Sequence, residues 1–310
     1  MALMKSITPE RYREELQEEG STDFGFDFGD KARFRVAIFR QQGNVCIVLR
    51  LIPSKIRSFD ELQLGPRIQE LLFHPRGLFL VTGPTGSGKT STLATLVDHI
   101  NSTRSAHIIT IEDPIEYRHQ HKKSIVSHRE VGVDVPSFSD ALRRALREAP
   151  DVILVGEMRD LESTQLAMMA AETGHLVLAT VHTQSAQGTI ERIVNQFPGN
   201  EQEQIRTQLA DTLLAVLSQT LVPRIEGGLV AAYEVLLATP AVRHLIRDKK
   251  THRIDSAIQT SREKGMQLLD DHLLRHYSHG VIGRTEVMTR CRYPEDVAKA
   301  LVRIDAEGRA

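Results

Sequence analysis

The sequence predicts an α/β fold with a mostly parallel sheet, and three observations support this prediction. Short, nearly continuous apolar runs recur after residue 77, as in strands that are covered on both faces. Segments with helical patterning, Ser139–Glu148 with Ser139 as its N-cap and Leu161–Thr173, stand between these runs. A glycine-rich loop, Gly83–Thr90, links the first run to a helix-compatible segment, Ser91–His99. The candidate strands are Leu78–Thr82, His107–Ile111, Val152–Val155, Leu176–Val181 and Leu229–Val235.

A second, smaller α+β domain is predicted before this region, because the residue pattern there is different. From Phe24 to Ile52, apolar and polar residues mostly alternate, which indicates half-buried antiparallel strands, with turn residues at Gln41–Asn44. The charged segment Thr8–Glu19 is expected to form a short exposed helix. A polar stretch that ends in Gly65-Pro66 separates the two patterns. We therefore expect an N-terminal domain at residues 1–53, a linker at 54–66 and the main domain at 67–310.

The glycine-rich loop has the composition of a site for nucleotide phosphates. Its residues are Gly83, Pro84, Thr85, Gly86, Ser87, Gly88, Lys89 and Thr90. Glycines let successive backbone N–H groups turn toward one anion, and a following helix N-terminus favours negative charge. Lys89 supplies a positive charge for the β- and γ-phosphates, and Thr90 supplies a hydroxyl for Mg²⁺. A turn without a ligand is the alternative, and the strand before and the helix after the loop disfavour it.

Three further motifs follow the loop, each beside a candidate strand. Ile109–Tyr117 places acidic residues just past the carboxyl end of a strand, where ligands bind in parallel sheets. Asp151–Asp160 places Glu157 at such an end, where it can hold Mg²⁺ directly or through water. Gly174–Thr183 brackets a strand with histidines, and His182 is placed to contact the γ-phosphate. A solvated acidic loop and structural histidines are the alternatives, and the order of the motifs after the phosphate loop favours a nucleotide site.

Bulk composition excludes several classes of protein. The chain of 310 residues has a formal net charge of −1 and is 5% aromatic, so we expect no nucleic acid partner. Two separated cysteines, Cys46 and Cys291, exclude a four-cysteine zinc site and suit a reducing compartment. No uncharged apolar stretch reaches the length of a transmembrane helix, and Met1–Gly20 is too polar for a signal peptide. A cytoplasmic protein is expected.

From Thr22 onward the chain resembles the secretion-type ATPases of type IV pili and type II secretion, most closely the PilT branch of pilus retraction motors. Ala241–Asp248 is similar to the branch signature Ala-Ile-Arg-Asn-Leu-Ile-Arg-Glu, and the lack of a four-cysteine insertion favours retraction over assembly. The family's opening section, with its Ser-Asp-Leu-His-Leu stretch, has no counterpart, so its N-terminal PAS-like domain is expected in abbreviated form. The carriers of the resemblance are Gly83–Thr90 (Walker A), Ile109–Tyr117 (Asp box), Asp151–Asp160 (Walker B) and Gly174–Thr183 (His box).

The resemblance implies a RecA-like P-loop core that hydrolyses ATP with Mg²⁺ in a homo-hexameric ring. It makes Glu116 the catalytic glutamate that activates water and Glu157 the Walker B acid near the metal. It assigns His175 and His182 to the nucleotide site through the His box. It implies that Arg33, Arg35 or Arg50 reaches a neighbouring subunit's nucleotide, the alternative being a solvated basic face. It gives exposed Arg243 and Arg247 a part in retraction.

The same resemblance implies an inner-membrane pilus platform protein as partner, a paralogous pilus ATPase beside it, and a position at the cytoplasmic face of the inner membrane. Other functions stay open at this point. Within the family, an accessory retraction ATPase or a type II secretion or pilus assembly ATPase are the alternatives. More distant ones are a RecA-like nucleic-acid translocase and a nucleotide-binding regulator without turnover, against which Glu116 and Glu157 argue.

Overall fold

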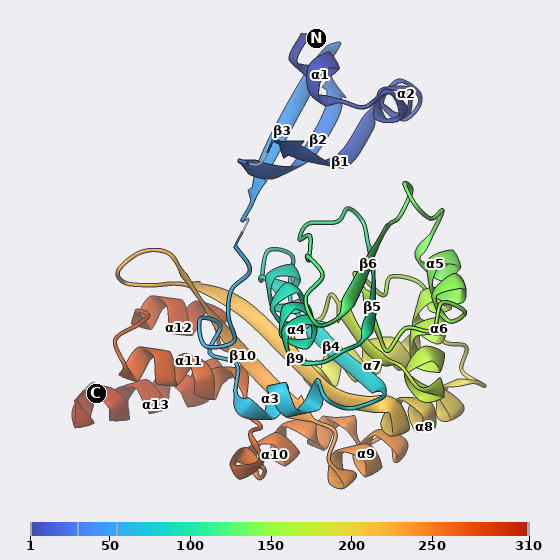
Figure 1. Cartoon of the computed structure of the whole chain (residues 1–310). Helices are drawn as coiled ribbons and strands as arrows, with labels where there is room; N and C mark the ends of the chain where they lie inside the picture. Colours follow the sequence, from blue (N-terminus) through green and yellow to red (C-terminus); the bar gives the residue numbers. More distant parts are fainter. Residues whose placement is uncertain (1, 30, 54, 309–310) are drawn as a thin grey trace.

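The computed structural model describes residues 2–29, 31–53 and 55–308, and it confirms the predicted α/β class. A small N-terminal domain lies above a larger core that is built on a second sheet (Figure 1). Ser54, where we placed the start of the linker, lies outside the described residues. The two sheets share no strand, so each part forms its own hydrophobic cluster.

The N-terminal domain is an antiparallel sheet with helices on one face. Its elements are α1 (Ala2–Ile7), α2 (Glu10–Glu18), β1 (Ser21–Phe28), β2 (Ala32–Gln41) and β3 (Asn44–Ile52). The strand order is β1-β2-β3, with all pairs antiparallel as the alternating pattern predicts. Leu16 of α2 packs with Phe24, Val36 and Ile38, which fill one face. The opposite face therefore carries the residues between them in sequence, including Arg33 and Arg35.

The segment that joins the two domains packs closely onto the core. Phe59, Leu62 and Leu64 are buried in the cluster that also contains Leu96 of helix α4 (Lys89–Thr103). The next helix, α3 (Pro66–Leu71), has proline at its first position, where a missing N–H costs nothing. The freely exposed part of the connection is therefore short, and most of the polar stretch belongs to the core.

Within the described residues, the core sheet has seven strands in the order β10-β9-β4-β8-β7-β5-β6. All pairs are parallel except β9 with β10. The strands are β4 (Gly77–Thr82), β5 (His107–Glu112), β6 (Ile125–Glu130), β7 (Val152–Val155), β8 (Leu176–Val181), β9 (Leu213–Pro223) and β10 (Leu229–Leu237).

Two of these strands, β6 and β9, were not predicted from the sequence. Strand β6 is an edge strand with polar residues such as Ser127 and Arg129, so it lacks the apolar run of a central strand. Strand β9 begins at the residue after helix α8 (Gln202–Thr212), with no turn residues to mark the change. It turns back into β10 through Gly227 and Gly228, both at positive φ. The run 229–235 is therefore an antiparallel edge strand and not a parallel one.

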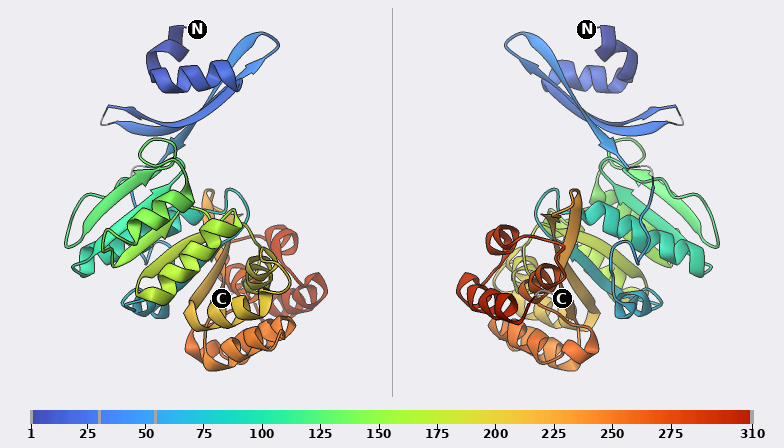
Figure 2. Two further views of the ribbon diagram at one scale, coloured as in Figure 1. Left: turned by 90° about the vertical axis from the view of Figure 1, so that its right-hand side faces the viewer. Right: turned by 90° about the vertical axis from the view of Figure 1, so that its left-hand side faces the viewer.

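Helices cover both faces of the core sheet (Figure 2). Helices α3 and α4 pack on one face, and most of the remaining helices pack on the other or on the β9–β10 edge. Helix α5 begins after Ser137, whose hydroxyl accepts the Asp140 N–H, so the prediction of Ser139 as N-cap is wrong by two residues. The other helices are α5 (Phe138–Ala145), α6 (Leu161–Thr173), α7 (Ala186–Asn195), α9 (Pro240–Arg247), α10 (Ile254–Gln259), α11 (Leu269–Ser278), α12 (Arg284–Arg290) and α13 (Pro294–Glu307), with short 3₁₀ turns η1 (Thr251–Arg253) and η2 (Arg262–Lys264).

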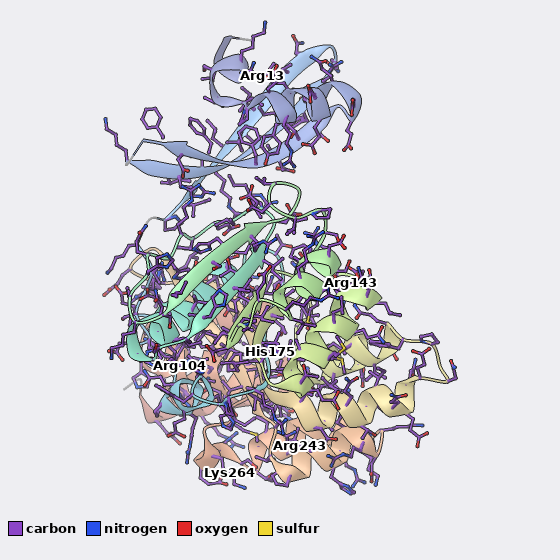
Figure 3. The ribbon with its side chains drawn as sticks, turned by 45° about the vertical axis from the view of Figure 1, so that its right-hand side comes forward. Arg13, Arg104, Arg143, His175, Arg243 and Lys264 are labelled. Atoms are coloured by element: carbon purple, nitrogen blue, oxygen red, sulfur yellow. The ribbon has the colours of Figure 1, made fainter. Side chains whose placement is uncertain are left out.

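Arg243 of helix α9 is held by main-chain carbonyls, contrary to our expectation of an exposed side chain (Figure 3). Its guanidinium donates to the Asp211 and Leu213 oxygens at 2.7 and 2.8 Å, and also to the Ala210 oxygen. These carbonyls lie where α8 ends and β9 begins, so Arg243 satisfies acceptors that a helix end leaves open. Arg247, one turn later, is exposed and pairs with the Asp211 carboxylate.

Replacing Arg243 by alanine is expected to lower the free energy of unfolding by about 1–3 kcal/mol, because several carbonyls lose a charged donor. Arg247→Ala is the matched control, and we expect a loss below about 1 kcal/mol from an exposed ion pair. Urea unfolding of both variants measures the difference. Equal losses would show that the carbonyl contacts of Arg243 contribute nothing beyond a surface charge.

Candidate nucleotide-binding site

The glycine-rich loop lies where β4 meets α4, as the sequence predicts. Gly83, Gly86 and Gly88 have φ values of 146°, 79° and 88°, a region that residues with a Cβ rarely adopt. Gly83 has a second constraint, because a Cβ there would lie 2.2 Å from the carbonyl oxygen of Gln219. Helix α4 begins at Lys89, directly after Gly88. The loop therefore presents main-chain N–H groups and a helix N-terminus to one place.

Lys89 lies over the loop and is nearly buried. Its ammonium donates to the carbonyl oxygens of Gly83 and Pro84 at 3.0 and 3.1 Å. Burial lowers the pKa of Lys89, and the charge of Glu157 opposes this shift. A phosphate at the loop would give this buried cation an anionic partner.

Strand β9 braces the loop through Gln219. The Gln219 amide donates to the Ser87 carbonyl at 2.6 Å and its oxygen accepts the Thr92 hydroxyl at 2.8 Å. One strand position thus fixes both the end of the loop and the first turn of α4. The sequence analysis gave Gln219 no role. The signal that could have found it is the polar triplet Ser218-Gln219-Thr220 inside an otherwise apolar run.

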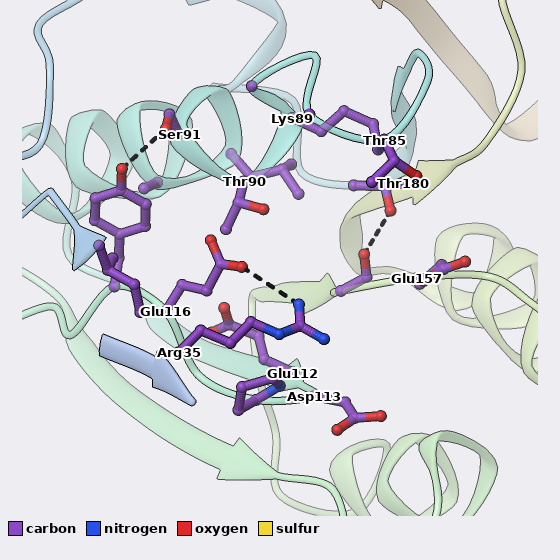
Figure 4. Close-up of a pocket in the computed structure, with 18 of the residues that line it drawn as sticks. Arg35, Thr85, Lys89, Thr90, Ser91, Glu112, Asp113, Glu116, Glu157 and Thr180 are labelled. Carbon is purple, nitrogen blue, oxygen red and sulfur yellow. Dashed lines mark hydrogen bonds and ion pairs between the residues drawn. The ribbon is translucent and has the colours of Figure 1, made fainter. Parts of the chain in front are cut away.

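Acidic residues from two neighbouring motifs face the loop across one pocket (Figure 4). Glu116, Glu157 and Thr90 all line this pocket, whose volume is about 570 Å³. Glu157 forms an ion pair with Arg159 at 2.8 Å and lies 3.2 Å from Nε2 of His182. Burial and the positive charge of Lys89 lower the pKa of His182, while Glu157 acts in the opposite direction. The parallel sheet brings these residues together because their strands end at the same edge.

Arginines of the N-terminal domain lie over the same pocket. Arg35 pairs with Glu116 at 3.8 Å, and Arg50, its cross-strand neighbour, lines the rim. Arg33 donates to the Ile115 carbonyl at 2.7 and 3.1 Å and pairs with Asp27. Arg33 and Arg35 are half-buried and each has a partner, whereas Arg50 is exposed. Within one chain, Arg35 and Arg50 line their own subunit's pocket, whereas the family resemblance implies a role at a neighbour's nucleotide.

An apolar contact holds the two domains in this arrangement. Ile52, the last residue of β3, is buried against Ala94 of α4 and Tyr117. The Tyr117 hydroxyl lies 2.9 Å from the Ser91 hydroxyl, in the first turn of α4. Because Ile52 is the cross-strand partner of Arg33, this contact sets the position of the arginine-bearing strands over the pocket.

His175 does not lie in this pocket, contrary to our expectation. It precedes β8, so it lies at the amino end of that strand, and His182 follows the carboxyl end. The His175 ring bonds to the Ala170 carbonyl through Nδ1 at 3.0 Å, and its own carbonyl accepts the Gly77 N–H (Figure 3). A strand of six residues separates the two histidines, and their places at opposite edges of the sheet exclude a shared ligand within the subunit.

Glu112, in the same motif as Glu116, is a buried carboxyl group that the sequence reading did not single out. Its side chain lines the pocket and lies 4.0 Å from Nδ1 of His128. Burial raises the pKa of Glu112 to about 7, with a hydrogen bond from Thr110 acting in the opposite direction. The group is therefore partly protonated near neutral pH.

Comparison with known proteins places this site in a family. Residues 16–227 match the family model described as type II/IV secretion system protein. The chain belongs to this family. It is 49% identical over 295 residues to the type IV pilus retraction ATPase PilT of Pseudomonas aeruginosa, which covers 95% of this chain and 86% of that protein. It is 46% identical to a twitching motility protein of Neisseria gonorrhoeae over 297 residues, 96% of this chain and 79% of that protein.

Solved structures show the same family fold. A crystal structure of the pilus retraction motor PilT with bound ADP has a TM-score of 0.89 at 48% identity, covering 96% of this chain and 85% of that chain. The Legionella pneumophila ATPase DotB has a TM-score of 0.78 at 28% identity, covering 93% and 81%. Across the part of the chain that the structure describes, we find no helix long and apolar enough to cross a membrane.

The pKa of Glu112 gives a prediction for stability. Because the folded pKa is raised from 4.5 to about 7, the cost of the buried charge is absent below pH 4.5 and complete only above pH 7. Stability should therefore fall as the pH rises through this window. Glu112→Gln should raise the free energy of unfolding by about 1–3 kcal/mol at a pH near 8.5 and leave it unchanged near pH 4, when measured in nucleotide-free protein with a chelator. An equal gain at both pH values would contradict a titrating Glu112.

Proposed function

We propose that this chain is an ATP-hydrolysing motor that powers retraction of a type IV pilus. The observation that carries the proposal is the shared pocket, in which Lys89, Glu116 and Glu157 converge. One relative, PilT of Pseudomonas aeruginosa, is a type IV pilus retraction ATPase, and the similarity to it covers nearly the whole chain. Identity to the Pseudomonas aeruginosa pilus ATPase PilU is 39%, lower than the 49% to PilT, which favours a primary over an accessory retraction motor.

The residues of the pocket suit hydrolysis of ATP. The glycine-rich loop and Lys89 bind the β- and γ-phosphates, and Glu116 accepts the proton of the attacking water. The Thr90 hydroxyl and the Glu157 carboxylate are oxygen donors of the kind that Mg²⁺ prefers, directly or through water. Mg²⁺ supplies charge neutralisation at the phosphates when it is bound. His182, held beside Glu157, is placed to respond to the γ-phosphate.

Arg35 and Arg50 are proposed to contribute positive charge to the same subunit's site. The pairing of Arg35 with Glu116 supports this, since nucleotide phosphates between them would attract the guanidinium away from the carboxylate. Developing charge on the transferred phosphoryl group is what such cations stabilise. The interfacial role that the family resemblance implies stays a prediction, and a mixing experiment separates the two.

Assembly and partners are proposed on similarity alone. We propose a homo-hexameric ring that acts on an inner-membrane pilus platform protein from the cytoplasmic face, with a paralogous pilus ATPase beside it. Arg247 is the exposed arginine of the α9 signature and is proposed to serve coupling to that partner, whereas Arg243 belongs to the packing of α9. The domain division at residues 1–53, 54–66 and 67–310 remains part of this proposal, supported by the end of β3 at Ile52.

The first test compares three variants of the purified protein. Lys89→Ala should abolish turnover, because the phosphates lose their main cation, while the unfolding temperature stays near the wild-type value. Glu116→Gln and Glu157→Gln should bind ATP with a Kd within about threefold of wild type and lose at least about 100-fold in kcat. Unchanged hydrolysis in Lys89→Ala would overturn the site, and lost binding in Glu116→Gln would make that residue a ground-state contact.

The second test asks whose site Arg35 serves. Lys89→Ala and Arg35→Ala proteins are purified separately, mixed and allowed to exchange subunits. If Arg35 acts within its own subunit, every site in the mixture lacks one group, and turnover should not exceed the sum of the separate proteins. Activity well above that sum would place Arg35 in the neighbour's site, since some interfaces would regain both groups. A mixture of Lys89→Ala with wild type controls for subunit exchange.

A further inference from the structure

Glu234, in strand β10, is a buried carboxylate outside the nucleotide pocket. Only 1% of its surface is exposed, and one oxygen accepts the N–H of Ala186 at 2.7 Å. Ala186 is the first residue of helix α7, whose N-cap is Ser185. An acceptor at this place satisfies an N–H group that a helix start leaves open, and its negative charge suits the helix N-terminus.

The helix start that Glu234 holds follows directly on the His182 segment. His182 directly follows β8 and is three residues before the Ser185 cap, so the loop 182–185 is anchored at both ends. At the near end His182 lies 3.2 Å from Glu157, and at the far end Ala186 bonds to Glu234. The orientation of His182 in the pocket therefore depends on where Glu234 places the start of α7.

The second oxygen of Glu234 faces Arg292, between helices α12 and α13. The Arg292 guanidinium lies 3.5 Å from Glu234 and 3.3 Å from Asp255 of α10. Arg292 is fixed through its backbone, because the Asp270 carboxylate accepts the N–H groups of Arg292 and Tyr293 at 2.7 and 2.8 Å. The C-terminal helices thus position the guanidinium of Arg292 beside Glu234, the carboxylate that bonds to the start of α7.

This pair joins a buried carboxylate to a half-buried guanidinium, and such a pair is a poor source of stability. Removing two charges from water costs about as much as their attraction returns, and apolar residues of similar size often do better. The cost of burying the Glu234 charge also appears in its pKa, which burial raises to about 6. The Ala186 hydrogen bond and the charge of Arg292 act in the opposite direction. Such a pair is better suited to fixing one arrangement of the segments that it joins.

We propose that Glu234 is a positioning residue for the nucleotide site, which holds the His182 loop in place through Ala186 and ties it to the C-terminal helices through Arg292. This inference rests on the proposed ATPase function, because it gives the orientation of His182 a part in turnover. A second contact runs in parallel, since Thr251 of η1 donates to Glu191 of α7 at 2.9 Å. Helix α7 is therefore fastened to the C-terminal region at two points.

The test uses Glu234→Gln and Arg292→Met in the full chain. Glutamine keeps an oxygen for Ala186 and loses the charge that Arg292 requires. We expect each variant to lose on the order of tenfold in kcat, while the KM for ATP and the Kd for ADP stay within about threefold. Arg292→Lys should recover part of kcat. Arg290→Met, an exposed arginine two residues earlier, is the matched control and should keep wild-type kcat.

A double variant decides whether the two residues act as one link. If they do, Glu234→Gln with Arg292→Met should lose no more than about twofold beyond either single change, because each already breaks the pair. Losses that multiply would overturn the link. A fall in unfolding temperature with kcat unchanged well below that temperature would reduce the pair to a structural role and overturn the proposal as well.

A readout without turnover separates this inference from the proposed function. Amide hydrogen exchange at Ala186, measured in nucleotide-free protein, should be on the order of tenfold faster in Arg292→Met and unchanged in Arg290→Met. Unchanged exchange at Ala186 in Arg292→Met would overturn the link even if the protein is an active ATPase. If exchange at Ala186 is faster in Arg292→Met but the Lys89→Ala variant still hydrolyses ATP, the link between Glu234 and Arg292 stands. The assignment of the nucleotide site is then wrong.

Discussion

The close contact between the glycine-rich loop and strand β9 is the constraint on which the site depends. Gly83 can take its backbone conformation only without a side chain, because the Gln219 carbonyl occupies the space of a Cβ. The same residue, Gln219, then bonds the other end of the loop and the first turn of α4. The loop is thus shaped by a strand that is distant in the sequence, since 132 residues separate Ser87 from Gln219. Lys89, Thr90 and the helix N-terminus take their positions from it.

Charge balance is the second organising feature of the pocket. Glu116 and Glu157 each form an ion pair with an arginine. Glu112 has a pKa raised to about 7, so protonation near neutral pH removes part of the cost of burying its charge. The cations come from different layers, since Arg35 belongs to the N-terminal sheet and Arg159 to the loop after β7. Nucleotide phosphates bring negative charge into this pocket, so binding must rearrange these pairs. The pocket is therefore an electrostatic connection between the two domains.

The central strands and the phosphate loop were predictable from sequence because each rests on local information. Strands β4, β5, β7 and β8 are apolar on both faces, and the loop is set by glycines and Lys89. Two of the misses, His175 and Arg243, have a common cause, which is that the deciding contact is distant in sequence. His175 and His182 look equivalent in the motif, and only the direction of β8 sends one to the pocket and the other to the opposite edge. Arg243 reads as the exposed residue of an amphipathic helix until α8 is placed beside it.

The short stretch of chain between the domains has a mechanical consequence. Ile52 and Arg33 are cross-strand partners, and Ile56 and Phe59, only a few residues later, already pack against the core. A rotation that lifts the arginines from the pocket must also unseat Ile52 from Ala94 and Tyr117. Tyr117 in turn touches the first turn of α4 through Ser91. Moving the N-terminal domain away from the pocket therefore also loosens the first turn of α4 below it. The same movement breaks the apolar contact of Ile52 and exposes its side chain to water.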